Sequence, residues 1–280
     1  MTASGGSPAT SPAVAPTVAV WKFASCDGCQ LTVLDCEDEL LAIAAALDLR
    51  MFLEAGPDEL LDHYDLSLVE GSVTTAHDAE RIRDIRARSG LLVTIGACAT
   101  AGGIQALRNT ADVADFIGAV YARPDWIDTL GTSTPIADHV AVDHELRGCP
   151  ISKHQLLDMI TALLAGRRLP VTGQSVCVEC KQRGNPCLLV AEGIACLGPI
   201  THGGCDALCP SLHRGCFGCF GPSEAVNADA LHAAWSEAGV SDDHWLRTLQ
   251  TFNVAAPEFR AAAESVAVQL RPEARDDGPR

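Results

Sequence analysis

Val18-Ala-Val-Trp-Lys-Phe23 runs into Ser25-Cys26-Asp-Gly-Cys29-Gln30 and then into the apolar, acidic stretch Leu31–Leu47. The first segment is short and apolar with β-branched residues, which predicts a strand; the second predicts a loop and the third a helix. The same alternation continues along the chain, with strands expected at Leu66–Val69 and Leu91–Ile95 and helices at Thr75–Ser89 and Ser152–Ala165. Such an alternation with short glycine-containing loops predicts an α/β domain with a parallel sheet over residues 17–170.

The pattern changes after Pro170. Gly, Pro and Cys dominate from Val176 to Pro222, and no helical or strand periodicity persists there. A segment of this kind cannot bury an apolar core of its own and needs metal or disulfide staples. Residues 223–280 return to Ala-rich helical sequence, as in Ala228–Ala238 and Phe259–Leu270. We therefore expect a disordered leader over 1–16, an α/β domain over 17–170, and a Cys-rich, mostly irregular domain with C-terminal helices over 171–280.

Charge and hydropathy limit the partners of this chain. Its 280 residues include 20 Lys and Arg against 36 Asp and Glu, which gives a net charge of −16. Phosphates attract Lys and Arg, so this balance argues against nucleic acid or an anionic membrane surface as the partner. No apolar run approaches the roughly 18 residues of a membrane-spanning helix. Residues 1–16 contain no Lys or Arg and so lack the features of a secretory or twin-arginine signal. We expect a cytoplasmic protein without membrane insertion.

Thirteen cysteines are the strongest compositional signal. An odd total fits poorly with complete disulfide pairing, and thiols in a reducing compartment are more often metal ligands or catalytic groups. Five of them lie in residues 26–149 and eight lie in residues 177–219. The two parts of the chain therefore carry related chemistry in different settings.

Four cysteines of the α/β domain follow predicted strands or precede predicted helices: Cys26, Cys29, Cys98 and Cys149. Such loops meet at one edge of a parallel sheet, so four distant thiolates can converge there. A close pair followed by two distant cysteines suits a 4Fe–4S cluster. The alternative is a thioredoxin-like redox pair at Cys26 and Cys29, which leaves Cys98 and Cys149 unexplained. Cys36 is the spare cysteine, and we interpret it as a small, partly buried residue.

The second domain holds two quartets of cysteines, each containing one close C-x2-C pair. The first is Cys177, Cys180, Cys187 and Cys196; the second is Cys205, Cys209, Cys216 and Cys219. On local spacing alone, two structural zinc sites are an alternative to two iron–sulfur clusters. A third four-cysteine set in a separate domain favours a redox relay, because zinc has no accessible second oxidation state.

Together these motifs resemble the small, electron-transferring subunit of nickel–iron hydrogenases, particularly the cytoplasmic class with the delta subunits of sulfhydrogenases and NAD(P)-linked enzymes. The resemblance covers roughly residues 17–222. The sequence motifs that carry the resemblance are Cys26-Asp-Gly-Cys29-Gln30, Val69-Glu70-Gly71-Ser72, Gly96-Ala-Cys98-Ala-Thr100, Gly148-Cys149-Pro150, Cys196-Leu-Gly-Pro199-Ile-Thr201, Gly204-Cys205 and Gly215-Cys216-Phe-Gly-Cys219.

The resemblance implies a flavodoxin-like N-terminal domain and three 4Fe–4S clusters. It gives the proximal cluster to Cys26, Cys29, Cys98 and Cys149, the distal cluster to Cys177, Cys180, Cys187 and Cys196, and the medial cluster to Cys205, Cys209, Cys216 and Cys219. An assignment in which some ligands interleave between the last two clusters stays open, as happens in bacterial ferredoxins. In many periplasmic relatives a His stands where this chain has Cys177, and the medial cluster has three cysteines where this chain adds Cys209.

The resemblance also implies partners. The proximal cluster would face a nickel–iron large subunit that activates H2, since this chain lacks the cysteine pairs that bind nickel. No G-x-G-x-x-G fingerprint is present, so NAD(P) and flavin would bind separate iron–sulfur and flavin diaphorase subunits. Glu70, at the end of a predicted strand, would lie near Cys26 and Cys98 at the large-subunit edge, or would serve only as a solvated or capping carboxylate. The competing interpretations are a complex I-like quinone-side cluster subunit and a zinc-stapled interaction protein.

Overall fold

The computed structural model describes residues 15–170 and 173–270. Its centre is a five-stranded sheet in the order β2-β1-β3-β4-β5, with every neighbouring pair parallel. The strands are β1 (Thr17–Lys22), β2 (Asp48–Phe52), β3 (Tyr64–Glu70), β4 (Ser89–Ile95) and β5 (His144–Leu146). This is the flavodoxin strand order, in which ligands bind beyond the carboxyl ends of the strands where the order reverses. The prediction of a flavodoxin-like α/β fold is confirmed.

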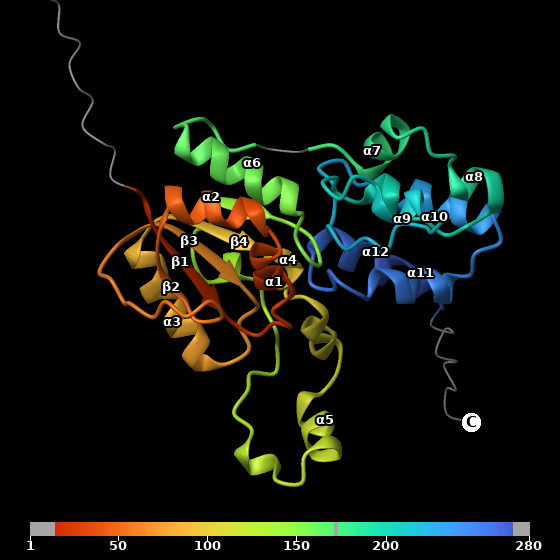
Figure 1. The fold of residues 1–280 in the computed structure, drawn as a ribbon. Helices are drawn as coiled ribbons and strands as arrows, with labels where there is room; N and C mark the ends of the chain where they lie inside the picture. Colours follow the sequence, from red (N-terminus) through yellow and green to blue (C-terminus); the bar gives the residue numbers. More distant parts are fainter. Residues whose placement is uncertain (1–14, 171–172, 271–280) are drawn as a thin grey trace, which may run out of the picture.

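Helices cover both faces of the sheet (Figure 1). The helices of this half are α1 (Gly28–Leu34), α2 (Asp38–Ala46), α3 (Ala76–Arg88), α4 (Gly96–Ala101), α5 (Val113–Val120) and α6 (Lys153–Leu164). Alternate residues of each strand point to opposite faces, which creates two apolar cores. On one face Val33 of α1 and Leu156 and Met159 of α6 pack against the strands. On the other, Ile82 and Ile85 of α3 fill the core.

The structure corrects one predicted helix. A single helix over Leu31–Leu47 is wrong: the helix begins at Gly28, ends at Leu34, and a second helix begins at Asp38. Glu37 adopts a left-handed φ of 47°, which interrupts the helical backbone between them. The sequence does not predict strands β2 and β5, because both are short and polar residues lie within them. The expected leader falls mostly outside the described residues.

The C-terminal half contains short helices among cysteine-bearing loops, followed by a small helical core (Figure 1). Its helices are α7 (Val176–Gln182), α8 (Leu188–Glu192), α9 (Leu208–Ser211), α10 (Ala228–Glu237), α11 (Asp242–Leu249) and α12 (Pro257–Leu270). Trp235, Trp245 and Phe259 are almost fully buried and pack these last three helices together. The sequence does not predict helix α11, because it is strongly charged apart from the buried Trp245 and Leu249.

An arm protrudes from the sheet domain between α4 and β5 (Figure 1). It consists of residues 104–134 and includes 3-10 helix η1 (Ile104–Thr110), α5 and 3-10 helix η2 (Pro124–Trp126). No residue of α5 is buried, although the helix is apolar. Phe116 is 54% exposed and Trp126 is 72% exposed. Several large apolar side chains exposed on one segment are typical of interaction sites.

Within the described part of the chain, none of the helices combines the length and the apolar character needed to cross a bilayer.

Candidate metal centres

The four cysteines of the α/β domain all lie beyond the carboxyl ends of strands; we call Cys26, Cys29, Cys98 and Cys149 the N-terminal group. Cys26 lies in the loop after β1, and Cys29 lies in the first turn of α1. Cys98 lies on α4, directly after β4, and Cys149 follows β5. The N–H of Ala97 donates to the carbonyl of Gly148 over 2.7 Å, which ties the last two loops together.

The thiols of the N-terminal group lie close enough to influence one another electrostatically. Burial raises the pKa of Cys29, and the thiolates of Cys98 and Cys149 raise it further. Burial raises the pKa of Cys98 to about 11, with contributions from Cys149 and Cys26. The structure therefore brings all four residues to one place, as parallel-strand geometry predicts. Buried thiols with raised pKa values stay protonated, so a metal that binds them must displace protons.

Glycines leave room for these sulfurs. Gly96 has a φ of +85°, and a Cβ there would overlap the Sγ of Cys29. A Cβ on Gly103 would lie 2.6 Å from the Sγ of Cys98. Gln105 lies beside the same sulfur, with its Nε2 3.5 Å from the Sγ of Cys98. Close backbone approach and donors to sulfur are the features that surround iron–sulfur clusters.

Glu70 ends β3 at the point where the strand order reverses. Its side chain is only 2% exposed, so the alternative of a solvated carboxylate is wrong. It accepts hydrogen bonds from the backbone N–H of Cys29 over 3.0 Å and from the Nε2 of Gln30 over 2.6 Å. Burial raises the pKa of Glu70, and these two donors oppose that rise. Glu70 therefore caps the first turn of α1 and lies beside the N-terminal group.

The first quartet of the C-terminal half is assembled by α7 and the loops around α8; we call Cys177, Cys180, Cys187 and Cys196 the 177–196 group. Burial raises the pKa of Cys177 to about 11, and the other three thiols each raise it further. A Cβ on Gly198 would lie 3.3 Å from the Sγ of Cys196 and 3.5 Å from that of Cys177. Cys187 is exposed, so this group reaches the protein surface.

The second quartet lines one cavity; we call Cys205, Cys209, Cys216 and Cys219 the 205–219 group. The cavity has a volume of about 250 Å³, and Cys149 of the N-terminal group also lines it. Burial raises the pKa of Cys219 to about 12, with contributions from Cys205 and Cys209. The N–H of Gly218 donates to the Sγ of Cys216 over 3.4 Å.

The three groups contact one another in a series. Cys149 lines the same cavity as Cys219 and the other cysteines of the 205–219 group, which places the N-terminal group next to the 205–219 group. The N–H of Cys216 donates to the Sγ of Cys196 over 3.2 Å, which joins the 205–219 group to the 177–196 group. Cys216 thus contacts Cys196 of the other quartet and lines one cavity with Cys219.

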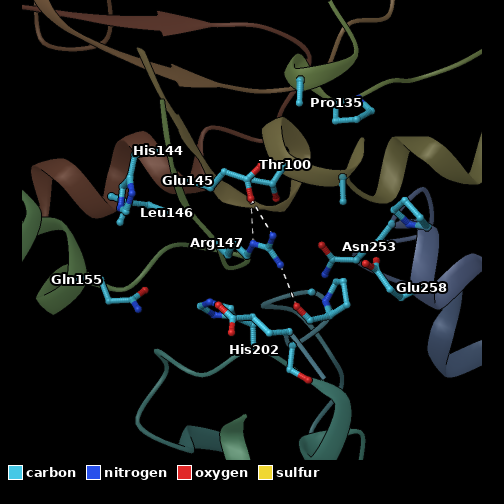
Figure 2. A pocket seen from close by; sticks show the side chains of 18 of the residues that line it. Thr100, Pro135, His144, Glu145, Leu146, Arg147, Gln155, His202, Asn253 and Glu258 are labelled. Atoms are coloured by element: carbon cyan, nitrogen blue, oxygen red, sulfur yellow. Dashed lines mark hydrogen bonds and ion pairs between the residues drawn. The ribbon is translucent and has the colours of Figure 1, made fainter. Parts of the chain in front are cut away.

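A cavity of about 630 Å³ lies between the sheet domain and the C-terminal half and is lined by residues of both, including Arg147 and Pro222 (Figure 2). Arg147 crosses it: its Nε donates to the Oε2 of Glu145 over 3.0 Å, and its Nη1 donates to the carbonyl of Pro222 over 2.9 Å. Arg147 is two residues before Cys149, and Pro222 is three residues after Cys219. This side chain therefore ties the two halves together beside the contact between two cysteine groups.

The donor sets suit clusters of several irons. Within residues 15–170 and 173–270, no three His, Cys, Asp or Glu side chains close around one point as a single ion requires. In a 4Fe–4S cluster each cysteine binds a different iron, so its four thiolates need not converge on one point. Three sets of four cysteines, glycines beside the sulfurs and N–H donors facing them therefore fit such clusters. Cys36 is fully buried in the sheet core and belongs to none of the sets.

Sequence reasoning missed three polar residues of this region: Gln105, Arg147 and Glu179. Gln105 also contacts Ala24 and Arg147 also contacts Pro222, both distant in sequence, so no local pattern marks these two contacts. Glu179 carries a signal, since it stands inside Cys177-Val-Glu-Cys180 and is buried there. A buried carboxylate between two cysteines needs donors from elsewhere in the fold.

Comparisons with known proteins show which proteins this chain is similar to. Residues 26–163 match the family model of the NADH ubiquinone oxidoreductase 20 Kd subunit. The chain is 34% identical over 233 residues to sulfhydrogenase 2 subunit delta of Pyrococcus furiosus, covering 83% of this chain and 97% of that one. It is 31% identical over 242 residues to a subunit of an F420-non-reducing hydrogenase of Methanocaldococcus jannaschii, covering 75% of this chain and 83% of that one.

A solved hydrogenase structure also contains a chain of similar fold. A chain of an NAD+-reducing [NiFe]-hydrogenase in the H2-reduced state superposes with a TM-score of 0.52 at 29% identity, covering 56% of this chain and 94% of that one. The sequence similarity to the Pyrococcus subunit runs through both halves and includes cysteine-rich sequence that the family model leaves out. The chain therefore belongs to the family of nickel–iron hydrogenase small subunits that includes the delta subunit of sulfhydrogenase 2.

Proposed function

We propose that this chain relays electrons within a hydrogenase through three 4Fe–4S clusters. The N-terminal group would hold the proximal cluster, the 205–219 group the medial cluster and the 177–196 group the distal cluster. When bound, each cluster would accept and donate single electrons. Residues 17–170 would form the proximal-cluster domain and residues 171–280 the domain of the other two.

The observation that carries this proposal is the serial contact among the groups. Cys149 and Cys219 line one cavity, and the N–H of Cys216 donates to the Sγ of Cys196, so the 205–219 group adjoins both of the other groups. Three isolated structural sites would not need these contacts. A relay needs them, because an electron must pass from each cluster to the next. The same contacts favour the relay over a zinc-stapled interaction protein, since zinc cannot change its oxidation state.

The nickel–iron large subunit is the proposed partner at the N-terminal group. Cys26 is exposed, and burial of this edge would protect the cluster. Ile104 and Leu107, 57% and 41% exposed, begin the apolar surface of the arm. Gln105 between them contacts Cys98 and also donates from Nε2 to the carbonyl of Ala24 over 2.6 Å. The arm is therefore continuous with the N-terminal group, and both would face the large subunit.

At the other end, exposed Cys187 makes the 177–196 group the proposed site of electron exchange with a further subunit. We propose an NAD(P)-linked diaphorase there, in a cytoplasmic complex. The support is the NAD+-reducing hydrogenase chain of similar fold; the F420-non-reducing relative is named for a different property, so the acceptor needs a direct test.

Metal analysis of the native complex tests the relay. The tagged full-length chain would be purified anaerobically with its co-purifying subunits, which are then identified. We expect about twelve irons and about twelve sulfides per copy of this chain beyond those of its partners, a nickel-containing large subunit, and H2-dependent reduction of NAD or NADP. Zinc in place of iron would overturn the relay, and about eight irons would remove one cluster. Reduction of other carriers alone would overturn only the NAD(P) assignment.

A further inference from the structure

Two carboxylates are buried in the part of the chain that the structure describes: Glu70, 2% exposed, and Glu179, 8% exposed. Neither forms an ion pair within residues 15–170 and 173–270. Glu side chains are almost never fully buried without a partner, because desolvating a charge is costly. Both lie beside cysteines, and both accept hydrogen bonds from backbone N–H groups of the loops and turns that carry those cysteines.

Glu179 joins two cysteine groups. It lies on α7 between Cys177 and Cys180 of the 177–196 group. Its Oε1 accepts from the backbone N–H of Gly204, and its Oε2 accepts from the N–H of Ala207 over 3.1 Å. Its Oε2 is also 4.0 Å from the Sγ of Cys205. The carboxylate of Glu179, which lies between two cysteines of the 177–196 group, therefore holds both ends of the loop that presents Cys205 of the 205–219 group.

The backbone of this loop is unusual in a way that an anion explains. Asp206 and Ala207 both adopt left-handed conformations, with φ of 55° and 50°, and Gly204 has a φ of 127°. Non-glycine residues avoid this region, and such conformations persist only where the surroundings fix them. Backbone turns can direct several N–H groups toward one concavity that binds an anion, and here the N–H groups of Gly204 and Ala207 face the same carboxylate. Here the carboxylate of Glu179 occupies that position.

The chain around the carboxylate is closely fitted. A Cβ on Gly203 would lie 3.0 Å from the Oε1 of Glu179, so a glycine suits this approach. Within the described ranges no ion pair neutralises Glu179, and its Oε2 lies 4.0 Å from the Sγ of Cys205, so its charge lies next to a proposed cluster ligand. A negative charge next to a cluster disfavours the addition of an electron, and net charge and burial are among the factors that set cluster potentials.

We propose that Glu179 is a positioning residue for the medial cluster: it holds Cys205 in place as a ligand, and its charge lowers the reduction potential of that cluster. The inference rests on the proposed relay. It assigns two roles to one side chain: Glu179 fixes the conformation of the loop that carries Cys205, and it lowers the reduction potential of the medial cluster.

Two variants separate the two roles. In Glu179→Gln the amide keeps the size of the side chain and one acceptor oxygen but loses the charge. In Glu179→Ala the acceptor is lost as well. Glu192→Gln is the matched control, because Glu192 lies on the neighbouring helix α8, is exposed, and pairs with the exposed His213. Each variant is made in the full-length chain and purified anaerobically with its co-purifying subunits.

Iron content and potentiometric titration followed by electron paramagnetic resonance give the readouts. We expect Glu179→Gln to keep about twelve irons and to shift the medial potential upward, and Glu179→Ala to lose about four irons. Glu192→Gln should match the wild type in both. An unchanged medial potential in Glu179→Gln, full iron in Glu179→Ala, or an equal shift in Glu192→Gln would overturn the inference. A wild-type chain without three iron–sulfur clusters would instead overturn the proposed relay.

Discussion

The identity of several residues around the cysteines is explained by the room available to their side chains. Gly96 and Gly103 leave no room for a Cβ because a sulfur occupies the position that the Cβ would take. Glu70 is buried and accepts hydrogen bonds from one backbone donor and one side-chain donor. Cys36 is fully buried in the sheet core, and its Sγ lies 3.6 Å from the carbonyl of Thr32. Replacements at these positions should therefore have separable effects on metal content and stability.

Gly96→Ala should remove the proximal cluster. The new Cβ would overlap the Sγ of Cys29, in a backbone conformation with φ of +85° that alanine rarely adopts. We expect a loss of about four irons per chain, measured after anaerobic purification. Gly118→Ala in α5 is the control: nothing lies near its Cβ, and alanine favours the helix by up to about 1 kcal/mol. Full iron in Gly96→Ala would contradict the proximal assignment.

Cys36→Ser and Cys98→Ser should behave differently. Serine at position 36 buries a hydroxyl in the sheet core, so we expect the free energy of unfolding to fall by about 1–3 kcal/mol with iron content unchanged. Serine at position 98 removes a proposed ligand and should lower iron content. Denaturant titration and iron analysis distinguish the two. If the first variant loses a cluster and the second does not, the ligand set of the N-terminal group is wrong.

At the scale of elements, the strands β1, β3 and β4 and the helices α3 and α6 are predictable from apolar runs and cap residues. Thr75 and Ser152, at which the two predicted helical ranges begin, cap the last two. From these elements the meeting of four distant cysteines at one sheet edge is predictable as well. The pairing of loops across the two halves is not, because the contacts of Arg147 and Glu179 depend on tertiary geometry. The break before α2 escapes prediction because the composition stays helical through it.

Arg147→Gln should loosen the connection between β5 and the C-terminal half. Its contact with the carbonyl of Pro222 spans the two halves beside Cys149 and Cys219. We expect faster hydrogen exchange at the amides of His202 and Ser223, which donate to the carbonyls of Gly221 and Ile200, without loss of iron.

Arg123→Gln is the control for this exchange experiment. Arg123 lies on the arm, where it pairs with Asp125 and lies over the ring of Trp126. It should leave the exchange at His202 and Ser223 unchanged. If hydrogen exchange at His202 and Ser223 is also unchanged in Arg147→Gln, contacts other than that of Arg147 hold this part of the C-terminal half in place.

The three cysteine groups form a row, in the sense that each adjoins the next, from the sheet domain into the C-terminal half. The arm extends from the sheet domain, which carries the end of the row where Cys26 is exposed (Figure 1). The family model covers only the sheet domain, whereas the row needs both halves. The net charge of −16 disfavours nucleic acid but says nothing of the arm, whose apolar residues carry the partner hypothesis.

Phe116→Ser with Trp126→Ser should reduce the amount of large subunit that co-purifies with the tagged chain by at least about tenfold, which corresponds to roughly 1.4 kcal/mol of binding. Iron content per chain should stay constant, because both side chains are exposed on the arm. Leu60→Ser with Leu164→Ser is the control: these side chains are also exposed but lie outside the arm, before β3 and at the end of α6. An equal loss in both pairs would contradict a role for the arm.

The two exposed thiols, Cys26 and Cys187, lie in the two outer groups of the row, and the 205–219 group lies between them. Oxidants reach the more exposed thiolates first. In the isolated chain, oxidative loss of clusters would thus begin at the two outer groups and reach the 205–219 group last. A partner bound over Cys26 would protect one outer group and leave the other, with Cys187, exposed to oxidants. Aged samples would then be a graded series in which the middle cluster survives longest, and their colour would fade in steps rather than along one smooth curve.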